Sequence, residues 1–215
     1  MPVAVLQIGE RIRAERARKG ISLRSLARSV GLSPSLISQI ETGKCQPSVS
    51  TLYAITTALG VSVQDVFGEA GASGDDAAAG HVALGRVAVP APPGHGGVTE
   101  TGGPVVCPGQ RDVLELDSGV IWQRLGRVPG SHVDFLLVSY APGGCSSPAG
   151  RLMQHAGTEY GYLIQGELIV TLGLRSHRLT PGDAVSFASV TPHSYRNEGT
   201  VPGVGIWFVA GSDGA

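Results

Sequence analysis

A short run of polar side chains near the N-terminus has the types and the spacing needed to contact nucleic acid. They share the outward face of a segment that we predict to be a helix over residues 33–42, and they are Ser33, Ser35, Ser38 and Gln39. A glutamine amide can pair with N6 and N7 of adenine, and serine hydroxyls reach bases or phosphates. Lys44, just after this helix, is placed for a phosphate contact, and so is Arg24, near a helix start. The alternative interpretation is a set of exposed polar residues without a ligand.

Two short helices joined by a tight turn must position these side chains. Small Ala27 stands where the two helices cross, and Gly31, four residues later, can take the positive φ that a sharp turn needs. Ser33 followed by Pro34 is a good helix start, and Gly43 is a good left-handed cap at the helix end. Apolar residues return to a common core at helical spacing, at Leu23, Leu26, Ile37 and Ile40. The pattern predicts a helix-turn-helix whose second helix enters the major groove.

With its flanks, this stretch resembles the DNA-binding domain of the xenobiotic-response-element (XRE) family, which includes phage Cro and repressor-like proteins. The resemblance covers residues 8–67 and rests on 8–13, 25–27, 31–33, 37–43, 47–48 and 59–61, with Leu52, Ile55 and Phe67. It implies a small all-helical domain that binds double-stranded operator DNA. The spacing of apolar residues predicts further helices over 6–19 and about 48–59, and a short fifth helix at the end of the domain.

The charge of the chain is divided between its two ends. The net charge of the 215 residues is −1, yet residues 1–67 hold eight Lys and Arg against four acidic residues, whereas the remainder holds eight Arg against thirteen. A basic module joined to an acidic one fits nucleic-acid binding by the first part only. The three cysteines, at 45, 107 and 145, form neither a zinc spacing nor a disulfide framework. With no apolar run long enough to span a membrane and no signal peptide at the N-terminus, we expect a cytoplasmic protein without a membrane partner.

A change of composition divides the chain into domains. Residues 68–110 hold eleven Gly, five Pro and eight Ala and no aromatic residue, so they cannot bury enough apolar area to offset the entropy lost on ordering. We predict a linker there, with a short strand over 82–89. The predicted organisation is a DNA-binding domain over 1–67, this linker over 68–110, and a second domain over 111–215.

The second domain has the pattern of a β structure. Short runs rich in Val, Ile, Leu and aromatic residues are separated by Gly, Pro, Asn and Asp turns, and they lie at 120–125, 133–140, 160–164, 168–172, 184–187 and 204–209. Nine of the eleven aromatic residues of the chain belong to this part. Many short strands at this spacing favour a small sandwich or barrel.

Two stretches of that domain, 155–168 and 179–197, resemble the two sequence motifs of the cupin family, a double-stranded β-barrel. The resemblance covers about 120–209. Matched position by position, it implies three metal ligands, His155, Glu159 and His193, while Met153 stands where metal-binding cupins have a further histidine. Two histidines and a carboxylate make a facial triad that suits Fe(II) and is also used by Mn, Ni or Zn. The alternative is a barrel that binds an organic ligand without a metal.

The combined prediction is a multidomain α plus β protein, with an N-terminal five-helix repressor-like DNA-binding domain and a C-terminal cupin double-stranded β-barrel. This layout resembles bacterial one-component transcription regulators. It implies a homodimer that binds DNA and responds to an unidentified small-molecule effector, and no enzymatic activity. Dimerisation matters because two small DNA-binding domains read two half-sites about 34 Å apart.

Two other functions fit parts of the same pattern. One is a mononuclear non-haem iron cupin enzyme of the hydroxypropylphosphonate epoxidase type, which has the same two-domain layout. The intact helix-turn-helix with its polar face speaks against the enzyme, because such chemistry needs no DNA-facing surface. The other is a DNA-binding protein whose cupin only dimerises.

Overall fold

The computed structural model describes residues 8–67, 105–128, 131–148 and 151–211. Most of the predicted linker, including the strand expected over 82–89, lies outside these residues. Of its last part, 108–110 forms a single 3-10 turn, Pro108–Gln110. The domain boundaries at 67/68 and 110/111 therefore stay predictions.

Over residues 8–67, five helices form the N-terminal part, as the sequence predicts. They are α1 (Ile8–Arg18), α2 (Leu23–Ser29), α3 (Pro34–Glu41), α4 (Val49–Leu59) and α5 (Val63–Phe67). A serine hydroxyl caps the start of three of them by accepting a hydrogen bond from a backbone N–H three residues later: Ser22 from Ser25, Ser33 from Leu36, and Ser48 from Thr51. These caps satisfy N–H groups that the first helical turn leaves without a partner.

The helical core consists of the residues that recur at helical spacing. Ile12, Leu26, Ile37, Leu52 and Ile55 are all fully buried or nearly so. Predicted turn chemistry is also confirmed, because the glycines at 31 and 43 both have a φ of 68°. None of the described helices is long and apolar enough to cross a membrane.

An ion pair between α1 and α3 adds a polar contact to this core. The guanidinium of Arg16 donates to both carboxylate oxygens of Glu41, with Nη2 2.8 Å from Oε2, and also to the backbone oxygen of Ile21. Glu41 is buried, so its charge depends on this partner. Arg16 therefore has a structural role in the helical part.

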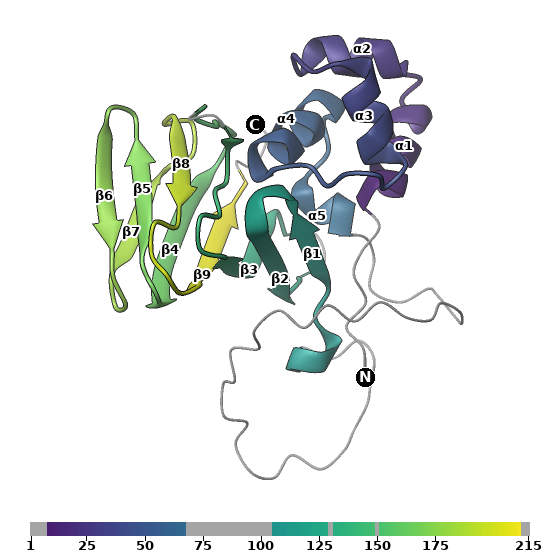
Figure 1. Ribbon diagram of the computed structural model, residues 1–215. Coiled ribbons are helices and arrows are strands. Elements are labelled where there is room, and N and C mark those ends of the chain that lie inside the picture. The colour runs from purple at the N-terminus through teal and green to yellow at the C-terminus, as the bar shows by residue number, and fades with distance from the viewer. Residues whose placement is uncertain (1–7, 68–104, 129–130, 149–150, 212–215) are drawn as a thin grey trace. The chain divides into compact units, whose positions relative to one another are not determined.

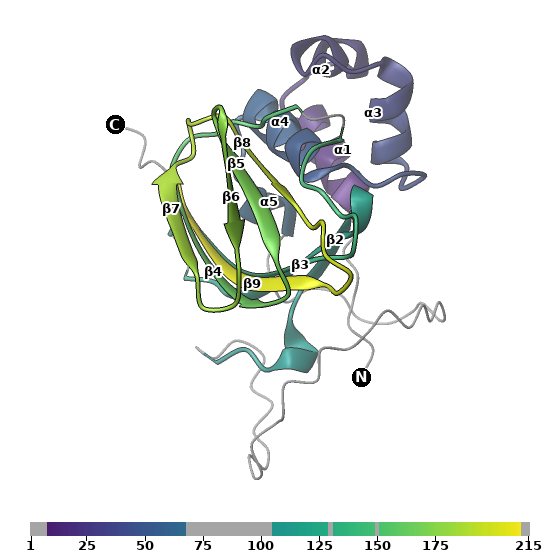
Figure 2. The same ribbon diagram turned by 60° about the vertical axis from the view of Figure 1, so that its left-hand side comes forward.

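Within the described residues, nine antiparallel strands build the C-terminal part as two sheets that lie face to face (Figure 1, Figure 2). The six-stranded sheet has the order β1-β2-β3-β9-β4-β7 and the three-stranded sheet the order β6-β5-β8. The strands are β1 (Val113–Leu116), β2 (Val120–Gly126), β3 (Val133–Tyr140), β4 (Thr158–Gln165), β5 (Leu168–Leu172), β6 (Arg175–Leu179), β7 (Ala184–Ala188), β8 (His193–Arg196) and β9 (Gly203–Ala210). The β-rich double sheet confirms the predicted cupin fold.

The barrel core lies between the two sheets and follows the period-2 alternation of the strands. Leu136, Leu163 and Trp207 of the larger sheet are buried, and so are Leu168 and Val170 of the smaller one. Sequence reasoning missed β1, β6 and β8. The reason is visible in β6, which carries only one buried residue, and in β8, which is four residues long and mostly polar. Neither strand has an apolar period long enough to detect.

Candidate functional site

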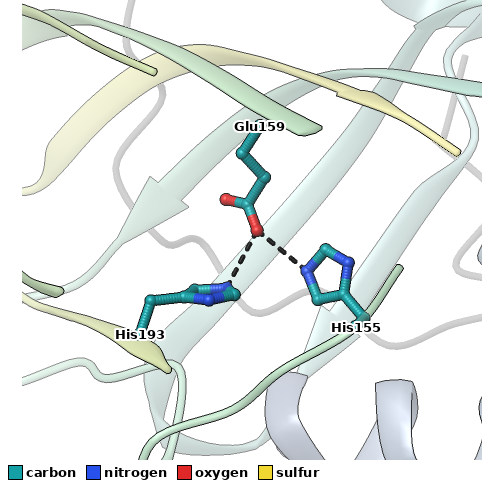
Figure 3. A group of neighbouring side chains, drawn as sticks. All are labelled: His155, Glu159 and His193. Carbon is teal, nitrogen blue, oxygen red and sulfur yellow. Dashed lines mark hydrogen bonds and ion pairs between the residues drawn. The ribbon is translucent and has the colours of Figure 1, made fainter. Parts of the chain in front are cut away.

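The three predicted metal ligands meet inside the barrel (Figure 3). Glu159 lies on β4 of the larger sheet, His193 begins β8 of the smaller sheet, and His155 precedes β4. The backbones of Met153 and His193 exchange two hydrogen bonds, of 2.8 and 2.9 Å, and the N–H of His155 donates to Ser189 O at 3.1 Å. These bonds hold the segment before β4 beside β8, so residues 38 positions apart share one site.

Both imidazoles point at the same carboxylate oxygen (Figure 3). Nε2 of His155 is 2.8 Å from Oε1 of Glu159, and Nε2 of His193 is 2.9 Å from the same atom. All three side chains are buried, and Glu159 and His193 are 2% and 0% exposed. The buried carboxylate and the two imidazoles form a compact group of three potential metal ligands, from which water is largely excluded.

The other ring nitrogens determine what these Nε2 atoms can do. Nδ1 of His155 lies 3.1 Å from the backbone oxygen of Ala156, and Nδ1 of His193 lies 2.8 Å from that of Thr191. A carbonyl only accepts, so each Nδ1 carries a proton and a neutral ring presents a lone pair at Nε2. Two such lone pairs face an anionic oxygen, and Nε2 of His193 has no hydrogen-bond partner. The arrangement needs a positive charge, either protons on the rings or a cation among the three atoms.

The donor spacing fits a divalent metal. Metal–ligand bonds of about 2.1 Å at right angles place neighbouring ligand atoms about 3.0 Å apart. The two observed separations, 2.8 and 2.9 Å, are close to that value. Histidines whose second nitrogen is held by a backbone carbonyl are also the usual form of a metal-binding imidazole. The residues therefore fit a metal such as Fe(II), Mn, Ni or Zn, and no metal is assigned to the site by geometry alone.

The carboxylate of Glu159 has an unusual electrostatic environment. Burial by itself raises the pKa of this group, but the favourable interactions of the carboxylate with the imidazoles of His155 and His193 outweigh burial and lower the pKa of Glu159 from 4.5 to about 2. The group is therefore an anion at neutral pH, which is the form that binds a cation.

Two aromatic side chains that sequence reasoning assigned only to the β-rich core orient this carboxylate. The hydroxyl of Tyr195 donates to Oε2 of Glu159 at 2.8 Å, and Nε1 of Trp207 donates to the Tyr195 oxygen at 3.1 Å. Burial and the nearby Glu159 charge raise the pKa of the Tyr195 phenol well above its ordinary value, so the phenol keeps its proton. Their position beside Glu159 follows from strand register, which has no local sequence signal.

A side chain of the helical part lines a small cavity beside the triad. The helices and the barrel belong to one compact unit. The ring of Tyr53, on α4, stacks on that of His155 with 3.9 Å between centroids and 2° between planes. The cavity has about 20 Å³ of space, and Tyr53, Val49, Met153 and Glu159 are among the residues that line it. Tyr53 was also missed, because its spacing on α4 is that of an ordinary core residue.

The predicted DNA-contacting residues lie at the surface of the helical part. Arg24, Ser35, Gln39 and Lys44 are exposed and Ser38 is half-buried. Ser33 is exposed as well, and its oxygen accepts the capping hydrogen bond, which leaves its O–H free to donate. Leu36, on the same helix, is half-buried and packs against the core.

Comparisons with known proteins agree with this architecture. Residues 7–66 match the family described as helix-turn-helix domain, and residues 136–209 match the cupin domain family. The HTH-type transcriptional regulator PuuR of Escherichia coli (strain K12) is 26% identical over 191 residues, which cover 88% of this chain and 86% of that protein. An HTH_3 family transcriptional regulator from Vibrio cholerae has the same fold, with a TM-score of 0.61, 18% identity and coverage of 95% of this chain and 94% of that one. The match to the hydroxypropylphosphonic acid epoxidase of S. wedmorenis covers 97% of this chain and 100% of that chain. Its sequence identity is 19% and its TM-score only 0.43.

Proposed function

We propose that this chain, a transcriptional regulator that joins an XRE-type helix-turn-helix domain to a cupin domain, binds operator DNA as a homodimer and senses a small molecule at the His155–Glu159–His193 site. The observation that carries the sensing proposal is the pair of imidazole nitrogens that face one buried carboxylate oxygen. A DNA-binding protein has no structural need for such an arrangement, which is costly to bury without a cation. A regulator of this kind acts where the chromosome is, so the proposal includes a cytoplasmic location.

Exposed polar groups on α3 support the DNA-binding part of the proposal. Gln39 and Ser35 are exposed on the helix that would enter the major groove, and Lys44 follows it. The amide of Gln39 suits adenine, and the ammonium of Lys44 suits a phosphate. In this proposal base contacts come from α3, while Arg24 and Lys44 contribute sequence-independent affinity.

His155, Glu159 and His193 would hold a divalent metal in this proposal. When bound, the metal would supply open coordination positions to which an oxygen- or nitrogen-bearing effector can bind. Tyr195 keeps one carboxylate oxygen engaged, so the other remains directed at the two imidazoles.

The small cavity supports a route from the sensing site to the DNA-binding helices. Its volume of about 20 Å³ holds about one water molecule, and an organic effector needs far more space. Tyr53 and Val49 of α4 are part of its wall. In addition, the N–H of Ser50 on α4 donates to Ser146 O of the barrel at 3.0 Å. In this proposal an effector that enters the barrel displaces α4 residues, and it shifts the helical part by as much as its affinity differs between the two arrangements.

The barrel surroundings do not favour the epoxidase alternative. A phosphonate substrate would need cationic partners near the metal, yet no arginine or lysine is among the residues that line the described cavity. Four arginines of the second part are exposed, at 151, 175, 178 and 196. Arg178 and Arg196 form ion pairs with Glu167 and Glu198 instead.

Selection of genomic fragments by the purified protein at physiological salt tests the regulator. A footprint with two-fold symmetry that Gln39→Ala combined with Ser35→Ala abolishes is the expected result. Glu15→Ala, on the exterior of α1, is the matched control that leaves the footprint unchanged. If only weak, steeply salt-dependent and sequence-indifferent binding is found, the proposal fails.

A further inference from the structure

The outer face of the six-stranded sheet carries an uncharged patch of side chains. In the strand register, three rows of paired residues run across β3, β9, β4 and β7. The middle row is Phe135, Phe208, Tyr160 and Ser186; the rows beside it are Leu137, Ile206, Tyr162 and Ala184, and Val133, Ala210, Thr158 and Ala188. None of these twelve residues is charged. We call this set the outer-sheet patch.

Aromatic rings dominate the patch and are open to solvent. Tyr160 and Tyr162 are 51% and 49% exposed, and Phe135 and Phe208 are 38% and 40% exposed. The Phe208 ring meets the rings of Phe135 and Tyr160 edge to face, both at 6.3 Å, so the three form a continuous ladder. Rings that are left uncovered expose apolar area to water, which is unfavourable. Their grouping on one face therefore marks a binding surface.

We propose that the outer-sheet patch is the surface through which two copies of this chain associate, with a second copy of the same patch as its partner. The inference rests on the proposed function, because a regulator that reads two half-sites needs a two-fold dimer. It also rests on chemistry, since an uncharged aromatic surface does not suit DNA or any strongly charged partner.

The shape of the patch is self-complementary, as a two-fold interface requires. Large rings project from β4 and β9, whereas the neighbouring positions of β7 are small, at Ala184, Ser186 and Ala188. A groove lies where the large side chains give way to the small ones. It is lined by Tyr160, Tyr162, Ala184, Ser186, Ile206 and Phe208. In a two-fold arrangement the rings of one copy enter the groove of the other, and the same contact is made twice.

The size of the patch agrees with the core of a dimer interface. The patch spans four strands that lie about 4.8 Å apart, and about five residues of each strand with a rise of about 3.3 Å per residue. Once side chains are included, its flat area is roughly 20 by 20 Å. That is about half of the roughly 800 Å² that each partner of a stable complex buries. The aromatic patch would form the dry centre, and the surrounding polar residues the rim.

Sedimentation analysis of the full chain tests the assignment. The wild type is expected to be a dimer at micromolar concentration, and Tyr160→Glu combined with Phe208→Glu is expected to weaken association by about 30-fold or more. Leu174→Glu, at a fully exposed leucine outside the patch, is the matched control and stays dimeric. Tyr160→Phe keeps the ring and stays dimeric as well. An unchanged circular-dichroism spectrum and melting temperature of the double variant establish that it folds.

The outcomes separate this inference from the function on which it rests. A wild-type monomer, including one whose patch is covered by residues 69–104 of its own chain, overturns the inference. A double variant that is still dimeric also overturns it, while a symmetrical operator footprint would leave the regulator in place. A monomeric double variant that loses two-fold protection but keeps sequence preference for a single half-site supports both.

Discussion

Tyr195 donates its hydroxyl hydrogen to Oε2 of Glu159 across the barrel interior, over 2.8 Å and from the opposite sheet. The bond engages one carboxylate oxygen and leaves Oε1 facing the two imidazoles. Because the carboxylate is already held in one orientation, it loses no further rotational freedom when a cation binds to its free oxygen. Tyr195 therefore orients a metal ligand without being one.

Replacement of Tyr195 by Phe should weaken metal binding by about 10- to 100-fold, because the carboxylate loses its fixed orientation. Titration calorimetry of the metal-free protein with Mn²⁺ or Zn²⁺ measures the effect. Tyr140→Phe is the control, since Tyr140 is an equally buried tyrosine whose hydroxyl does not hydrogen-bond to Glu159. Equal affinities of wild type and Tyr195→Phe would remove Tyr195 from the site.

Replacement of Tyr53 by Leu should disconnect the metal site from DNA binding. Tyr53 stacks on His155 and belongs to α4, so the ring is the direct contact between the triad and the helical part. We expect operator affinity of the wild type and of Tyr53→Phe to change on metal addition, and that of Tyr53→Leu to stay constant. Fluorescence anisotropy with labelled operator, with and without metal, gives the comparison. A Tyr53→Leu variant that responds like the wild type would show that the signal takes another route.

Replacement of Arg16 by Ala should destabilise the helical part by about 3 kcal/mol, because it leaves the buried carboxylate of Glu41 without a partner. Urea denaturation followed by circular dichroism measures the loss. Arg18→Ala is the matched control, since Arg18 pairs with Glu15 at the surface and its removal should change little. If the two variants are equally stable, the charge of Glu41 is compensated by other groups.

Gln39 and Lys44 should differ in the kind of DNA affinity they supply. Gln39→Ala should cost about 1–3 kcal/mol and relax the base preference at one position, because an amide reads a base edge. Lys44→Ala should weaken binding to all sequences alike and reduce the salt slope by about one, because an ammonium neutralises a phosphate. Binding isotherms at several salt concentrations, on the operator and on unrelated DNA, distinguish the two. Identical salt slopes for Lys44→Ala and the wild type would exclude its phosphate contact.

Local signals in the sequence predicted the helical part well. The serine caps, the glycines with positive φ and the 3.6-residue spacing of apolar residues each act over a few positions, so they can be read without the fold. The six strands other than β1, β6 and β8 were predicted for the same reason, since their alternation is local. Strands β6 and β8 were missed because pairing with β5, rather than their own composition, makes them strands.

By itself the sequence determined the five helices, the β-rich second part and the candidate ligands His155, Glu159 and His193. Only the tertiary structure decided which other side chains act on them. Tyr195 lies 36 positions from Glu159 and Tyr53 about a hundred from His155, and strand register and helix packing bring each pair together. The Arg16–Glu41 pair and the outer-sheet patch arise in the same way. The physical reason is that caps and turns are settled by neighbours along the chain, whereas burial and contact between distant residues exist only once the chain has folded.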